Sequence, residues 1–131
     1  MKLFNDFLKF TKEQGIALED IYQEKGDEYS MVSFGEQGKE DVIYNVTLVF
    51  YNDDVSAEIY IRKQIDTEDL LSVLQQINRL NSEYSGMTFF LDDGILSLKS
   101  LCLADGDIET VLYQMVQNIE IAEIEFVEFQ A

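Results

Sequence analysis

The sequence contains no histidine in 131 residues. Histidine is the side chain that most often acts as a general acid or base near neutral pH, and it is the commonest metal ligand. Proline is also absent, and Cys102 is the single cysteine, so no disulfide can form within the chain. No linker, low-complexity segment or internal repeat divides the sequence. We therefore expect one domain, residues 1–131, that is stabilised by a hydrophobic core rather than by a metal or a disulfide.

Basic residues are scarce. Nine Lys and Arg stand against 26 Asp and Glu, which gives a net charge of -17 at pH 7. Such a field repels the phosphates of nucleic acids and of anionic lipids, so we expect no nucleic-acid partner and no membrane partner. The acidity favours solubility, and it also favours a basic protein partner.

Long hydrophobic runs are absent too. No run approaches the ~18 apolar residues that a membrane-spanning helix needs. The first ten residues are interrupted by Asn5, Asp6 and Lys9 and do not form the apolar region of a secretory signal. The sequence therefore predicts a soluble, cytoplasmic protein.

Apolar periodicity predicts eight elements. They are a helix over 2–14, strands over 28–36, 42–51 and 57–62, a helix over 67–84 with Asp66 as its N-cap, strands over 87–91 and 95–103, and a helix over 108–119. The segment 121–129 fits either more helix or a short strand. The predicted fold is α+β, in the order α-β-β-β-α-β-β-α, with an antiparallel five-stranded sheet and helices packed on one of its faces.

The residues that could carry chemistry have simpler explanations. Cys102 lies in a strand pattern with no basic neighbour closer in sequence than Lys99, so we interpret it as a packing residue. The acidic groups coincide with turns and helix starts, where aspartate is favoured for its backbone hydrogen bonds, and none follows the order of a calcium loop. These groups are Asp53/Asp54, Asp92/Asp93 and Asp105/Asp107/Glu109. We expect no enzyme, no cofactor and no metal site, and leave open a carboxylate pair assembled across the fold.

Apolar residues exceed what one sheet face needs. Val49, Tyr51, Tyr60 and Phe90 alternate away from the predicted core, and the apolar stripe of the helix over 67–84 is wide enough for a subunit interface as well. Two interpretations remain at this point: a partner binds these side chains, or a tail or loop of the chain covers them.

The order of elements resembles the YbjN-like family and the related type III secretion chaperone-like fold. The residues that carry the resemblance are the strand face from Val42 to Phe50, the turn Asn52-Asp53-Asp54, the strand from Ala57 to Arg62, the helix from Thr67 to Tyr84, and the hairpin from Met87 to Leu103 around Asp92-Asp93-Gly94. The resemblance covers nearly the whole chain and contains no invariant motif.

The resemblance implies a non-enzymatic domain, often a homodimer, that binds protein or peptide segments; YbjN-like members are described as candidate regulators of sensory transduction. It implies self-association through Leu71, Leu74, Met87, Phe89 and Phe90, and client contact through Phe4, Phe7, Tyr51 and Tyr60.

The predicted function is thus a cytoplasmic protein- or peptide-binding module, chaperone-like or regulatory. The alternative is an acidic, immunity-type protein that neutralises a basic partner.

Overall fold

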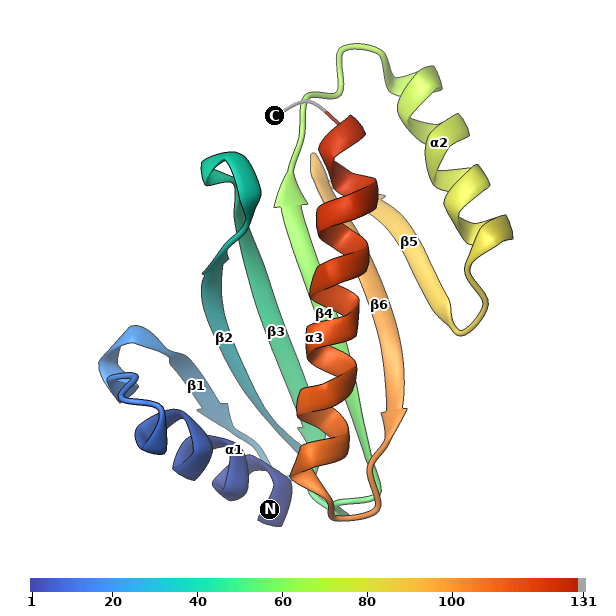
Figure 1. The fold of residues 1–131 in the computed structure, drawn as a ribbon. Coiled ribbons are helices and arrows are strands. Elements are labelled where there is room, and N and C mark those ends of the chain that lie inside the picture. The colour runs from blue at the N-terminus through green and yellow to red at the C-terminus, as the bar shows by residue number, and fades with distance from the viewer. Residues whose placement is uncertain (130–131) are drawn as a thin grey trace.

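A computed structural model gives the structure of the chain and describes residues 1–129, the side chain of Leu18 excepted. Three α-helices and six strands make up most of it (Figure 1). The elements are α1 (Lys2–Glu13), β1 (Tyr22–Lys25), β2 (Tyr29–Gln37), β3 (Ile43–Tyr51), β4 (Ser56–Gln64), α2 (Leu70–Glu83), β5 (Met87–Asp92), β6 (Ile95–Leu103) and α3 (Ile108–Glu125), with short 3-10 turns at Leu18–Asp20, Lys39–Asp41 and Phe126–Glu128. The α+β class and the antiparallel sheet are confirmed.

The sheet has six strands in the order β1-β2-β3-β4-β6-β5, so the expected number of five was wrong. The additional strand is β1, which pairs with Ser30–Ser33 of β2. All four of its residues are exposed, and a strand without a buried face has no apolar alternation to reveal it. The remaining strands lie within a few residues of their predicted positions.

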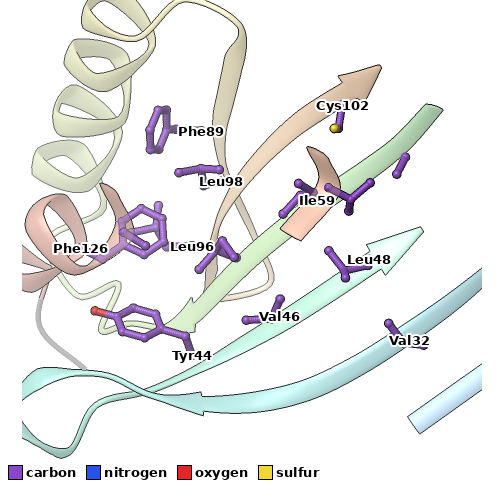
Figure 2. Packing of buried hydrophobic residues seen from close by; sticks show 14 of the residues in the cluster. Val32, Tyr44, Val46, Leu48, Ile59, Phe89, Leu96, Leu98, Cys102 and Phe126 are labelled. Atoms are coloured by element: carbon purple, nitrogen blue, oxygen red, sulfur yellow. The ribbon is translucent and has the colours of Figure 1, made fainter. Parts of the chain in front are cut away.

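The two faces of the sheet differ in cover. On the inner face, alternate residues of β3, β4 and β6 are fully buried and form the centre of the core (Figure 2). They include Val46, Leu48, Ile59, Ile61, Leu96 and Leu98. Helix α3 crosses this face over β4 and β6, α1 packs beside it, and α2 lies against β5 at the sheet edge (Figure 1). The expectation that the helices share one face is met.

Helix α2 begins later than its sequence suggests. Asp69, and not Asp66, is the N-cap, because its carboxylate accepts the backbone N–H of Ser72 at 3.3 Å. Asp66 makes a similar bond two residues onward, to the N–H of Glu68, and so forms a turn before the helix. Both aspartates satisfy backbone donors, and only the backbone conformation tells the two uses apart.

The C-terminal segment that the sequence left open is helical. Helix α3 runs to Glu125, and Ala122, Phe126 and Phe129 are buried at near-helical spacing. Lys63, on the inner face of β4, holds this end. Its buried ammonium donates to the carbonyls of Phe126 at 2.9 Å and Phe129 at 2.7 Å, and its burial lowers its pKa.

Candidate functional site

The outer face of the sheet carries the strongest cluster of interacting polar and aromatic groups. We call it the open face, because helices α1, α2 and α3 all pack on the opposite side. Its exposed apolar side chains include Tyr22, Tyr29, Ile43, Ile95, Leu101 and Leu103. They occupy the positions that alternate with the core residues, as the strand register requires.

Two tyrosines on the open face share one carboxylate. The hydroxyl of Tyr51 on β3 donates to Oε1 of Glu58 on β4, and the hydroxyl of Tyr60 donates to Oε2 at 2.7 Å. Lys99 on β6 places its Nζ 3.1 Å from the same Oε2. Arg62 stacks its guanidinium over the Tyr60 ring, 4.8 Å from the centroid. These contacts fix the two rings on the surface of three adjacent strands.

Within this cluster the pKa of Glu58 is lowered and the pKa values of Tyr51 and Tyr60 are raised. Burial alone would raise the pKa of Glu58, but the hydrogen bonds from Tyr51 and Tyr60 and the charge of Lys99 outweigh it and lower the value. The hydrogen bond to Glu58 raises the pKa of Tyr51, and burial followed by the same carboxylate raises that of Tyr60. Glu58 therefore stays ionised and both tyrosines stay protonated near pH 7. A general acid or base needs a pKa near the working pH, so this arrangement suits binding better than proton transfer.

Two shallow cavities flank the cluster. One, of about 490 Å³, lies over β2, β3 and β4 between Ser33, Asn45 and Arg62. The other, of about 400 Å³, lies over β5 and β6 and is lined by Tyr60, Phe90, Lys99 and Leu101 among others. Both lie on the open face and are wide rather than enclosed, which is the shape of a docking surface more than of a small-molecule pocket.

The structure brings Tyr51 and Tyr60 together, as part of one cluster. It places the other two predicted client contacts elsewhere: Phe4 and Phe7 are fully buried. The centroid of the Phe7 ring lies 6.0 Å from that of Phe34 and 5.8 Å from that of Phe50, so α1 packs its apolar stripe against the sheet. The assignment of Phe4 and Phe7 to a client-binding surface was wrong.

The five residues expected at a dimer interface are divided among three places. Leu71 and Leu74 are 69% and 47% exposed on the outer side of α2. Met87 is half-buried, and Phe90 points to the open face. Phe89 is buried beside Tyr84, with ring centroids 5.6 Å apart, so its assignment to a subunit surface was wrong.

Glu58, Arg62 and Lys99 belong to the site but were not singled out from the sequence. Alternation places Glu58 and Arg62 on the same face as Tyr60. Lys99 joins them because β6 lies beside β4, where Tyr60 pairs with Lys99. The order of the strands in the sheet does not follow from any local sequence pattern. The cluster could have been found only by knowing which strands lie beside β4.

The other candidates for chemistry have structural roles. Cys102 is buried, and burial raises the pKa of its thiol, so it stays protonated near neutral pH. Asp53 and Asp107 accept backbone N–H groups in a turn and at the start of α3. Within residues 1–129 no three acidic or cysteine side chains lie close enough together to hold a metal ion.

In the described part of the chain, no helix has the length and apolarity that a membrane crossing demands. Comparison with protein-family models, with curated proteins and with solved structures found no match to this chain.

Proposed function

We propose that this protein is a non-enzymatic binding module, chaperone-like or regulatory, that holds an extended segment of a protein partner on the open face of its sheet. The observation that carries the proposal is the cluster in which Glu58 fixes the rings of Tyr51 and Tyr60 at the surface. Rigid tyrosines lose little conformational entropy on binding and offer an apolar ring with a polar edge, which is why they are frequent in binding sites.

The net charge of the protein favours a basic partner, and the exposed apolar side chains of the open face favour one that is also apolar. The protein carries 26 acidic residues and a net charge of -17. A basic segment is attracted to a protein of this net charge over a Debye length of about 8–10 Å at ordinary salt, while apolar contacts supply the affinity at close range. The exposed Tyr29, Ile43 and Leu101 extend the apolar contacts along the strands on either side of the cluster.

The same proposal includes a homodimer formed through α2. Leu70, Leu71 and Leu74 are all exposed on one side of this helix, although it packs its other side on β5. Three exposed leucines at i, i+1 and i+4 form a compact apolar patch that a second copy could bury by symmetry. Membership of the YbjN-like family and a cytoplasmic location stay predictions.

Affinity capture with matched variants tests the proposal. The tagged protein is used to capture partners from an extract of the cells that make it, at low and high salt, and the partners are identified by mass spectrometry. Tyr60→Asp should reduce capture, whereas Tyr113→Asp, at an exposed tyrosine of α3, should not. Undiminished capture by a folded Tyr60→Asp variant would contradict the assignment of the open face.

Capture at low and at high salt distinguishes the binding module from the alternative, an acidic protein that neutralises a basic partner. A single basic partner that is bound one-to-one and released at high salt would favour the acidic neutralising protein, since charge would then dominate binding. A partner retained at high salt would favour the apolar binding module.

A further inference from the structure

The upper half of β2 has a free edge. Strand β1 pairs only with Ser30–Ser33, while β2 continues to Gln37 (Figure 1). Residues Gly35, Glu36 and Gln37 are all exposed. Among the described residues, no strand lies beside this half of β2 on the side opposite β3.

The hydrogen-bond pattern shows which groups point to that edge. In an antiparallel ladder, successive residues bond alternately to the two neighbouring strands. The N–H of Gly38 donates to Val42 on the β3 side, and the carbonyl of Tyr29 accepts from Gly26 on the β1 side. Even-numbered residues of β2 thus bond to β3 and odd-numbered ones face outward. Gly35 and Gln37 therefore present their N–H and C=O groups to the free edge.

An apolar cavity lies directly beside this edge. It has a volume of about 290 Å³ and is the most enclosed of the cavities described, between α1, β2 and α3. Its apolar lining includes Phe10, Ile16, Ile21, Phe34 and Met115. Pockets for drug-sized ligands usually measure about 300–1,000 Å³, so this cavity lies at the small end of that range and has room for an apolar side chain. The flexible side chain of Met115 can adjust to the shape of the group that the cavity holds.

Among the described residues that line the cavity, only acidic ones carry charge. Asp20 and Glu36 line the cavity, both are exposed, and no Lys or Arg is among its lining residues. A ligand bound at this edge therefore contacts the backbone groups of β2, the apolar cavity and the negative charges of Asp20 and Glu36.

We infer that the free edge of β2 and the adjoining cavity form a docking site for a basic, extended peptide segment that adds as a strand beside Gly35–Gln37 and inserts one aliphatic side chain between Phe34 and Met115. Backbone bonds to Gly35 and Gln37 set the register of the peptide, the cavity selects its central side chain, and Asp20 and Glu36 select its flanking charges. The inference rests on the proposed binding function and names a second contact, at the sheet edge, for the same class of partner.

A family of synthetic peptides tests each part. The probe is the acetylated, amidated heptapeptide Thr-Lys-Val-Leu-Val-Lys-Thr, whose two lysines share the face of the central Leu, titrated into the full-length protein by calorimetry. Replacing the central Leu by Ala should weaken binding about tenfold or more, because the cavity loses its apolar occupant. Replacing both Lys by Glu, or methylating backbone nitrogens on the side that faces β2, should abolish binding.

Two isoleucines provide a matched pair of variants. Ile16 lines the cavity and is 45% exposed, whereas Ile124 is 65% exposed on α3, outside the cavity and the open face. Ile16→Asp should weaken the Leu peptide about tenfold or more, and Ile124→Asp should leave it unchanged. Ile43→Asp, at an isoleucine that is 68% exposed on the open face, tests whether the peptide binds there instead. Met115→Ala, which enlarges the cavity, should shift preference from a central Leu toward a central Phe. Circular dichroism confirms that each variant is folded.

The possible results distinguish failure of the edge site from failure of the proposed function. If Ile43→Asp weakens the peptide and Ile16→Asp does not, the peptide binds the open face, so the edge site is refuted while the proposed function stands. If no peptide of the family binds, the edge site is refuted, and the capture experiment decides the proposed function separately. Amide exchange that slows at Gly35 and Gln37 on binding of the Leu peptide places the strand at this edge.

Discussion

The side-chain amide of Asn81 on α2 pairs with both backbone groups of Phe89 on β5. Its Nδ2 donates to the Phe89 carbonyl at 2.9 Å, and its Oδ1 accepts the Phe89 N–H at 2.7 Å. Strand β5 lies at the edge of the sheet, so these two groups would otherwise be open to pairing with another strand. Asn81 therefore occupies the place of a neighbouring strand.

Asn81→Ala should destabilise the protein and expose the β5 edge. Leaving a donor and an acceptor of Phe89 without partners costs about 1–3 kcal/mol when the groups are shielded from water, and we expect the lower end because Asn81 is at the surface. Denaturant unfolding measures the loss, and light scattering at rising concentration measures self-association. Asn78→Ala, at an exposed asparagine of the same helix, is the control, and an equal effect of both changes would contradict the role of Asn81.

Asp54 should make α1 sensitive to acid. The helix has no side-chain cap of its own, and Oδ1 of Asp54 accepts the N–H of Leu3 at 3.0 Å from the turn between β3 and β4. Burial alone would raise the pKa of Asp54, but bonds from the N–H groups of Leu3 and Lys2 and from the terminal amine lower it below its ordinary 3.8. Its stabilisation is complete above that value and is lost as the pH falls through the lowered pKa.

Asp54→Ala should cost about 1–2 kcal/mol near neutral pH, the usual effect of removing an N-cap. Asp54→Asn keeps an oxygen acceptor and tolerates the positive φ of 63° at this position, so it should cost less. Urea titrations between pH 2 and 7 should show that the difference between wild type and Asp54→Asn shrinks toward acid. A difference that stays constant over this range would show that the charge of Asp54 has no part in the cap.

Glu58→Gln should lower the pKa values of Tyr51 and Tyr60. The carboxylate is the largest cause of the raised pKa of Tyr51 and the second cause, after burial, for Tyr60. Removing its charge makes tyrosinate less costly, so part of the ultraviolet absorbance change of tyrosine ionisation should move to lower pH. Glu68→Gln, at an exposed residue before α2, should leave the titration curve where it is.

Leu71→Glu with Leu74→Glu should yield a monomer if α2 forms the proposed homodimer. Both side chains are exposed, so the double change should leave the free energy of unfolding of the monomer nearly unchanged. Sedimentation equilibrium of the wild type and of the variant measures the mass in solution. Ile124→Glu, at an exposed isoleucine of α3, is the control. A wild type that is monomeric at every concentration would refute the dimer.

Lys63→Met should loosen the C-terminal end of α3. Methionine fills a similar apolar volume but offers no donor to the carbonyls of Phe126 and Phe129. Amide exchange across 126–129 should become faster than in wild type, while exchange in β3 and β4 stays slow. Lys99→Met removes a lysine from the open face and should leave these amides unchanged.

Much of the fold follows from periodicity in the sequence. The buried alternation in β3, β4 and β6 has a period of two, and Asp107 marks the start of α3 as expected for an N-cap. Strand β1 escapes this reasoning because none of its side chains is buried. Its existence depends on the neighbouring edge of β2, which only the assembled sheet supplies.

The candidate site was only partly predictable for a similar reason. Alternation marks Tyr51 and Tyr60 as residues that face away from the core. The same reasoning marks Phe4 and Phe7 as apolar, but it cannot tell whether an apolar stripe is used by the core or offered to a partner. The contacts of Phe7 with Phe34 and Phe50 decide this in favour of the core.

The pairing of β4 with β6 governs how the chain can reach its native state. Gln64 and Ile95 are paired, although α2 and β5 lie between them in sequence, whereas the β2-β3-β4 meander and the β5-β6 hairpin join near neighbours. The two local units can form early, and the entropy of closing the long intervening loop must be overcome before β4 and β6 meet. We therefore expect the docking of the two units to limit the rate of folding, and we expect a chain cut in the segment between β4 and α2 to reassemble from its two fragments.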